Sequence, residues 1–275
     1  MCQNKTFHSR LVMARSKKRK LDHQLPSKSN GHPLKVAKTA SQRKNSAHTP
    51  TPEIPFDAED RILLVGEGDF SFAKSIVEHH GCCDVIATCF DSPDELMEKY
   101  KPQAEEHIAC LEDEGQKVLY HVDATKLKAT KSLAKERFER IIFNFPHVGG
   151  KTKDVNRQVR FNQELLVKFF ASAKERLDAS GTIVVTLFEG EPYTLWNIRD
   201  LARHAGLEVA RSFKFNSEAY PGYAHARTLG NIDGGGGWKG EDREARSFVF
   251  QIKGISAGEP KRKKRKSGDG SGDDD

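Results

Sequence analysis

A short turn rich in glycine and carboxylates is the first place in the sequence where chemistry can be expected. Gly66 and Gly68 stand in the stretch GEGDFSF, directly after the apolar run ILLV. Glycines here let the backbone turn sharply and let a ligand approach main-chain N–H groups at the start of the next helix. A dinucleotide-binding turn would carry a third glycine where Ser71 stands. Glu67 and Asp69 would repel a pyrophosphate and favour a cationic centre or an ammonium group, and S-adenosylmethionine carries both.

Two more carboxylates follow the next two apolar runs. Asp91 comes 25 residues after Gly66, and Asp123 follows the run KVLYHV. A carboxylate such as Asp91 at the end of a second strand can accept hydrogen bonds from both ribose hydroxyls, and Asp123 could contact an adenine amino group. The alternative for each aspartate is a helix N-cap or a turn residue. Acidic groups at three successive strand ends predict a cofactor that contains a nucleoside.

The fourth apolar run ends in the tetrapeptide Asn144-Phe145-Pro146-His147, for which we predict a catalytic role. In a doubly wound sheet this strand end faces the ligand crevice. The Asn144 amide and neighbouring carbonyls can hold a ring N–H or amino group, Phe145 can stack on a planar base, and Pro146 stiffens the turn. His147 could accept a proton near neutral pH. The alternatives are a core aromatic for Phe145 and a surface loop histidine for His147.

A third candidate patch lies late in the chain, in the stretch YPGYAHART. Tyr220, Tyr223, His225 and Arg227 interleave aromatic and basic side chains, a pattern that suits stacking on bases and contact with phosphates of RNA. The alternative is a packed loop whose tyrosines cover the edge of a sheet.

The elements that must position these residues alternate short apolar strands with longer amphipathic stretches. This alternation predicts an α/β fold of Rossmann-like type, with a mostly parallel sheet and an antiparallel final pair. We expect seven strands, over residues 61–65, 85–90, 117–122, 140–145, 181–188, 207–215 and 247–252. We expect helices over residues 70–80, 93–114 with a break near Pro102, 156–177 and 194–204.

Charge divides the chain into three parts. Residues 1–55 hold 12 basic and 2 acidic side chains, residues 56–253 hold 27 and 32, and residues 254–275 hold 6 and 5. We predict disordered tails on either side of one domain over 56–253. The basic runs Lys17–Lys20 and Lys261–Lys266 suggest binding to a nuclear import receptor or to phosphates, the alternative being solvated tails. The spacing of the five cysteines argues against structural zinc, and no apolar run is long enough to cross a membrane.

Several of these strings together resemble the fungal 25S rRNA uridine-N3 methyltransferase family. They are LLVGEGDFSF, ATCFDS, NFPHVGG followed by Arg157 and NQELL, and YPGY. The resemblance implies a class I methyltransferase fold that uses S-adenosylmethionine and acts on a uracil of large-subunit rRNA, free or in a pre-ribosome, in the nucleolus. It implies cofactor-binding roles for Gly66, Glu67, Gly68 and Asp91. It also implies that the tetrapeptide 144–147 faces the target base.

Uracil N3 is a poor nucleophile while it is protonated, so a proton acceptor is expected near the base. His147 is the first choice by residue type, with Asp69 or Glu189 as alternatives. Two other functions compete with methyl transfer. One is a nicotinamide-dependent oxidoreductase, against which the acidic turn argues. The other is an RNA-binding ribosome-assembly factor that keeps the cofactor fold without turnover.

Overall fold

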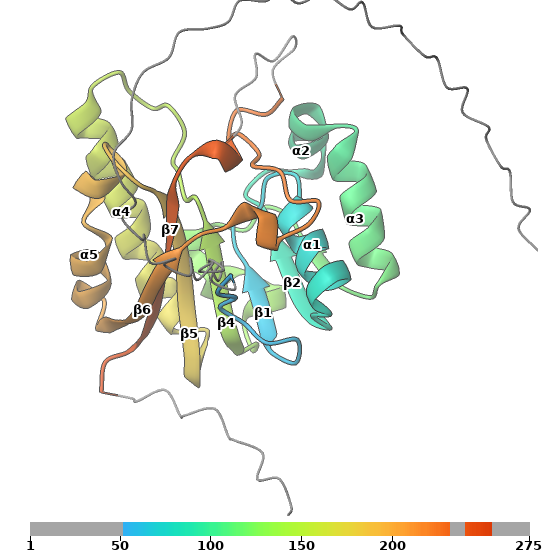
Figure 1. Ribbon diagram of the computed structural model, residues 1–275, viewed down its shortest axis with the longest axis horizontal. Helices are drawn as coiled ribbons and strands as arrows, with labels where there is room; N and C mark the ends of the chain where they lie inside the picture. The colour runs from blue at the N-terminus through green and yellow to red at the C-terminus, as the bar shows by residue number, and fades with distance from the viewer. Residues whose placement is uncertain (1–51, 232–239, 255–275) are drawn as a thin grey trace, which may run out of the picture. The chain divides into compact units, whose positions relative to one another are not determined.

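Seven strands form one sheet in the order β3-β2-β1-β4-β5-β7-β6 (Figure 1). The structure, a computed structural model, describes residues 52–231 and 240–254. The first five strands run parallel, and β7 runs antiparallel to both β5 and β6. The predicted seven-stranded sheet is therefore confirmed. The strands are β1 (Arg61–Leu64), β2 (Asp84–Thr88), β3 (Lys117–Leu119), β4 (Phe138–Asn144), β5 (Leu177–Phe188), β6 (Leu207–Lys214) and β7 (Ala245–Ile252).

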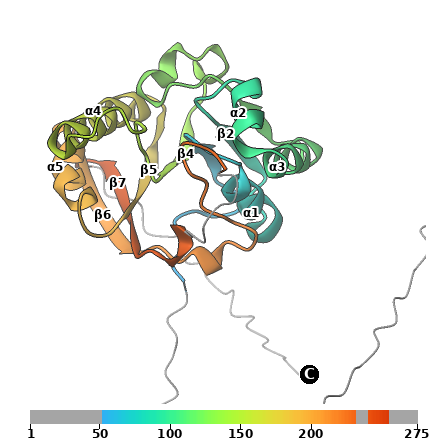
Figure 2. The same ribbon diagram turned by 90° about the horizontal axis from the view of Figure 1, so that it is seen from above.

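Helices cover both faces of the sheet, which Figure 2 shows from above. One face carries α1 (Ser71–His80), α2 (Pro93–Tyr100) and α3 (Gln103–Asp113), and the other carries α4 (Val155–Lys174) and α5 (Ile198–His204). Short 3-10 helices complete the described elements: η1 (Ala124–Ala129), η2 (Lys131–Leu133), η3 (Tyr193–Trp196), η4 (Ser217–Ala219) and η5 (Gly240–Asp242). Among the described residues, no helix combines the length and the apolar character needed to cross a membrane.

Side chains that alternate along β1 divide between two hydrophobic clusters. Ile62 and Leu64 belong to the cluster to which α1, α2 and α3 contribute, whereas Leu63 and Val65 belong to the cluster with α4 and α5. Successive residues of a strand point to opposite faces, so a sheet covered on both sides needs apolar residues at every position. Because both faces are filled by packing, a ligand can reach this sheet only at its ends.

The sequence places the break near Pro102 correctly, since α2 ends at Tyr100 and α3 begins at Gln103. Proline disfavours helical geometry in the residue before it, so the two helices cannot be continuous. The start of α2 is equally local in origin. Ser92 accepts a hydrogen bond from the Glu95 N–H while the Glu95 carboxylate accepts one from the Ser92 N–H, which is a capping box.

Several predicted boundaries are wrong. The helix expected over 194–204 begins only at Ile198, after η3 and after Asn197, which adopts the left-handed conformation at φ 51°. The helix expected over 156–177 ends at Lys174, and Leu177 already pairs with Phe138 as the first residue of β5. The strand expected over 117–122 ends at Leu119, because His121 adopts the left-handed conformation at φ 55°.

Residues 1–51 and 255–275, which hold both basic runs, lie outside the described residues, and their disorder stays a prediction. Residues 52–55, assigned to the first tail, contact the domain, since Arg140 Nε donates to the Pro55 carbonyl at 3.1 Å.

Candidate active site

The carboxyl ends of β1, β2 and β4 meet at a cavity of about 1030 Å³. Eleven of the fourteen residues predicted from the sequence line it, so residues from five separate stretches of the chain share one site. They are Gly66, Glu67, Gly68, Asp69, Asp91, Asp123, Asn144, Phe145, His147, Tyr223 and His225. The other three, Pro146, Tyr220 and Arg227, are not part of the lining.

The glycine turn leaves no room for side chains at either glycine. Gly66 has φ +69°, and a Cβ added there would lie 2.5 Å from the ring of Phe143. A Cβ on Gly68 would lie 2.7 Å from the Cβ of Ala226. The turn is tied to β2 by a hydrogen bond of 2.8 Å from the Glu67 N–H to the Thr88 carbonyl. Its backbone is therefore held at the floor of the cavity, where a ligand can approach it closely.

The two carboxylates of this turn lie in a partly buried, acidic environment. Asp69 is only 6% exposed and accepts a hydrogen bond from the Ser71 N–H at 3.0 Å. Glu67 accepts one from the Ala73 N–H at 3.3 Å. Burial, and then the neighbouring charge of Asp69, raise the pKa of Glu67 to about 8. The pair therefore resists carrying two negative charges, and a bound cation would favour the ionised form of Glu67.

The aspartates at the next two strand ends already have partners within the protein. Asp91 forms an ion pair through Oδ1 with Lys99 Nζ at 2.6 Å. Asp123 caps η1, because its Oδ1 accepts hydrogen bonds from the N–H and the hydroxyl of Thr125 at 2.9 and 2.6 Å. Although burial opposes the change, these bonds lower the pKa of Asp123. Asp123 thus has the N-cap role that was its alternative, while still lining the cavity.

The end of β4 combines backbone strain with an unsatisfied donor. Phe145 has φ +50°, a conformation that is rare for a large side chain, and its N–H donates to the Thr186 carbonyl at 2.9 Å. Its ring centroid lies 4.5 Å from those of Phe188 and His225. Asn144 Nδ2 is buried, and the described residues offer it no hydrogen-bond partner. A buried donor without a partner costs about 1–3 kcal/mol, and because this one lines the cavity it can donate to an acceptor on a ligand.

The geometry of His147 argues against the proton-acceptor role expected from its residue type. Its Nδ1 accepts a hydrogen bond from the Gly149 N–H at 2.9 Å, and burial lowers its pKa. A neutral ring whose Nδ1 is an acceptor carries its hydrogen on Nε2. His147 therefore offers a donor. Glu189, an alternative acceptor, lies outside the cavity lining and pairs with Arg246 at 2.6 Å.

The segment 220–230 lies over the glycine turn. The Ser71 hydroxyl donates to the Ala224 carbonyl at 3.0 Å and also lies 3.2 Å from the Ala224 nitrogen. The Tyr100 hydroxyl donates to the Arg227 carbonyl at 2.6 Å. These contacts join α1 and α2 to residues more than 120 positions later in the sequence. The segment therefore forms one wall of the cavity.

The four residues predicted to bind RNA have different positions in this segment. Tyr220 is 3% exposed and stacks on Phe215 with centroids 5.4 Å apart, so its burial corrects the prediction in favour of the packed-loop alternative. Tyr223 and His225 line the cavity, with Tyr223 Oη 3.1 Å from His225 Nδ1. Burial lowers the pKa of His225 to about 4, so the ring is neutral near pH 7. Arg227 is exposed.

Sequence reasoning missed several residues of the lining. Phe90 is 70% exposed beside Asp91, and its aromatic face is available to a planar ligand. Its place at a strand end could have indicated this role. On α4 the missed residues Phe161, Glu164, Leu165 and Lys168 follow the spacing of one helical face, which could also have been read from the sequence.

Comparisons with known proteins identify the family of this chain. Residues 63–227 match the family described as rRNA (uridine-N3-)-methyltransferase BTM5-like. The 25S rRNA (uridine(2634)-N(3))-methyltransferase of Saccharomyces cerevisiae is 30% identical, over 80% of this chain and 81% of that protein. Human ferredoxin-fold anticodon-binding domain-containing protein 1 is 35% identical over 60% of this chain and 27% of its own length. The crystal structure of a methyltransferase from Pyrococcus furiosus is 20% identical with a TM-score of 0.43, over 71% of this chain and 77% of that one. Matched over more than half its length, the chain belongs to the BTM5-like rRNA (uridine-N3-)-methyltransferase family.

Proposed function

We propose that this protein transfers a methyl group from S-adenosylmethionine to N3 of a uridine in large-subunit rRNA. The observation that carries the proposal is one cavity that joins an acidic glycine turn to the buried, unpartnered amide of Asn144. The activity named for the yeast relative supports the same reaction. The cellular setting would be ribosome biogenesis in the nucleus and nucleolus. The runs Lys17–Lys20 and Lys261–Lys266, which would bind an import receptor, lie outside the described residues.

The residues around the turn fit this cofactor. Gly66 and Gly68 stand where an added Cβ would clash with Phe143 or Ala226, so glycine keeps the turn backbone open to a close ligand. Glu67 with Asp69 can supply negative charge for a sulfonium and an ammonium group. Asp91, which lines the cavity, can accept hydrogen bonds from ribose hydroxyls, and the exposed ring of Phe90 can stack on the adenine. When bound, S-adenosylmethionine supplies a methyl group that its positive sulfur has already activated.

The chain itself has to make uracil N3 reactive and hold it in line. Asn144 Nδ2–H and His147 Nε2–H are both donors, and each could bond to a uracil carbonyl oxygen. Such bonds stabilise the negative charge that spreads onto these oxygens as the N3 proton passes to solvent water, and they lower the pKa of N3. Phe145 can stack on the ring. The base must be unpaired, because N3 lies on its pairing edge.

A labelling experiment tests the proposed reaction. The full chain is incubated with methyl-labelled S-adenosylmethionine and large-subunit rRNA transcripts, and the RNA is digested and analysed for N3-methyluridine. We expect label in that nucleoside alone. Label in another nucleoside would refute the assignment to N3. Cofactor binding without any transfer, including to purified pre-ribosomal particles, would support the non-catalytic assembly factor instead.

Two substitutions of His147 distinguish a donor from a proton acceptor. We expect His147→Ala to slow single-turnover methyl transfer by about tenfold, in line with the loss of one hydrogen bond. His147→Gln keeps an N–H donor and should recover most of that rate, since glutamine cannot serve as a base near neutral pH. The proton-acceptor role would be supported instead if both variants lost the same fraction of the single-turnover rate and the wild-type rate depended on a group that titrates below pH 7.

The raised pKa of Glu67 predicts a pH dependence of cofactor binding. With a pKa of about 8, Glu67 is protonated at pH 7 in the free protein, whereas a cationic ligand favours its ionised form. Binding should therefore release a proton, and the association constant should rise by up to about tenfold per pH unit below pH 8. Calorimetry between pH 6 and pH 9 measures this slope.

Glu67→Gln is the control, because the amide keeps the shape and cannot titrate. The difference between the two pH profiles then reports Glu67 alone, whatever the ligand's own amino group contributes. The free proteins should differ too. Folding raises the pKa of the Glu67 carboxyl from 4.5 to about 8, so the free energy of unfolding of the wild-type protein falls as pH rises between these two values. The wild-type melting temperature should therefore fall relative to that of Glu67→Gln over this range. Parallel profiles in both measurements would contradict the raised pKa.

A further inference from the structure

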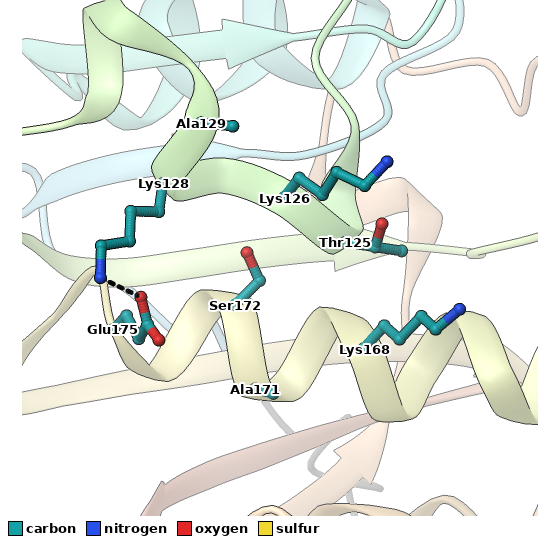
Figure 3. Close-up of a pocket in the computed structure, with 8 residues that line it drawn as sticks. All are labelled: Thr125, Lys126, Lys128, Ala129, Lys168, Ala171, Ser172 and Glu175. Atoms are coloured by element: carbon teal, nitrogen blue, oxygen red, sulfur yellow. Dashed lines mark ion pairs between the residues drawn. The ribbon is translucent and has the colours of Figure 1, made fainter.

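A second cavity, of about 530 Å³, lies between η1 and α4 (Figure 3). Figure 3 shows Lys126 and Lys128 on the η1 wall and Lys168 on the α4 wall. The two walls are joined by a hydrogen bond of 2.8 Å from the Leu127 N–H to the Ser172 hydroxyl. We call this cavity the lysine groove. Its lining consists of Thr125, Lys126, Lys128, Ala129, Lys168, Ala171, Ser172 and Glu175.

Each lysine of the groove has a carboxylate near it that a polyanion could replace. Lys126 lies 3.4 Å from Asp123, Lys128 lies 3.4 Å from Glu175, and Lys168 lies 2.6 Å from Glu164. All three lysine side chains are more than half exposed, between 57% and 71%. Exposed ion pairs of this kind contribute only about 0–1 kcal/mol, so they offer little resistance to exchange. The groove is therefore suited to bind phosphate groups through several ammonium groups at once.

The lysine groove adjoins the candidate active site. Thr125, Lys126 and Lys168 line both cavities. Lys151 also lines the active-site cavity, with its Nζ 5.8 Å from the ring centroid of Phe161. A strand whose target base entered the active site would thus have its neighbouring phosphates within reach of ammonium groups.

The charge of the domain is distributed so that an RNA strand would be attracted to the side of the active site where the lysine groove lies. Residues 123–175, which include η1 and α4, hold 12 Lys or Arg and 6 Asp or Glu. Residues 84–114, which include α2 and α3, hold 2 and 10. Although residues 56–253 are acidic as a whole, a polyanion is attracted to one side of the active site and repelled by the other.

We propose that the lysine groove binds backbone phosphates of the RNA strand that carries the target base. The inference rests on the proposed function, because it takes RNA as the substrate. It places sequence-independent RNA affinity on the folded domain, in addition to any contribution from the basic tails. Contacts of this kind position a substrate without reading its sequence.

The salt dependence of RNA binding tests the groove in the full chain. The triple variant Lys126→Ala, Lys128→Ala and Lys168→Ala should bind a single-stranded rRNA fragment with a shallower slope of log K against log salt. Each lost phosphate contact reduces the slope by about 0.7 on single strands, so three contacts amount to about 2. The same three positions changed to arginine should keep the wild-type slope, which separates loss of charge from damage to the fold.

A matched control changes lysines away from the groove. The triple variant Lys101→Ala, Lys117→Ala and Lys214→Ala removes the same charge, and Lys101 and Lys214 also lie in exposed ion pairs. It should keep the wild-type slope within about 0.7. If the wild-type protein methylates RNA and the alanine variant of the groove keeps the wild-type salt slope, only the proposal that the groove binds phosphates is overturned. A wild-type protein that binds no RNA would overturn both proposals.

Discussion

Replacing Asn144 by alanine is expected to slow single-turnover methyl transfer by about 100- to 1000-fold. Losses of this size follow the removal of one donor that stabilises developing charge in a closed site. The reason for expecting one here is that Asn144 Nδ2 is buried without a partner among the described residues, a state that a fold tolerates when a ligand completes it. Rapid-quench measurement of labelled RNA at saturating cofactor gives the rate.

Asn144→Asp is the matched control, because it keeps the shape of the side chain and removes the N–H donor. It should lose as much rate as alanine. The dissociation constant for S-adenosylmethionine should stay within about twofold of the wild-type value in both variants, since the amide acts on the base. A near-normal rate in Asn144→Ala, or a rate loss that follows entirely from weaker cofactor binding, would remove Asn144 from the proposed mechanism.

Gly66→Ala is expected to destabilise the protein by about 2–5 kcal/mol and to abolish tight cofactor binding. Two effects add at this position. An alanine at φ +69° costs about 1–2 kcal/mol, and overpacking against a core side chain costs about 1–3 kcal/mol more. The core side chain is Phe143, whose ring would lie 2.5 Å from the new Cβ. Because Phe143 packs edge-on against Phe169 of α4 at 5.0 Å, the ring has little freedom to move away.

Gly81→Ala separates the two effects. Gly81 ends α1 with the same φ of +69°, but a Cβ there meets nothing within 4 Å. It should lose only the backbone contribution, about 1–2 kcal/mol, and keep cofactor affinity. Chemical denaturation gives both free energies of unfolding, and calorimetry gives both dissociation constants. Equal losses of stability in the two variants would show that Phe143 does not constrain the turn.

Much of the site could be predicted because a parallel sheet converts order along the chain into proximity. Gly66, Asp91 and Asp123 each follow a parallel strand and Asn144 is the last residue of one, and the carboxyl ends of such strands meet at one edge. The strands themselves were recognisable because burial on both faces demands continuous apolar runs. Element ends were less predictable where the deciding contact is distant, as for Leu177, which pairs with Phe138.

The sequence by itself therefore determined the type of sheet, the strand ends that carry polar groups and the acidic character of the turn. These features depend on residue type and spacing. Only the tertiary structure decided which ring nitrogen of His147 carries the hydrogen, that Tyr220 is buried, and that η1 and α4 together line the lysine groove. Each of these depends on a backbone atom, a ring or a helix brought from elsewhere in the chain. The path of the backbone through space sets such contacts, and residue type at one position carries no record of it.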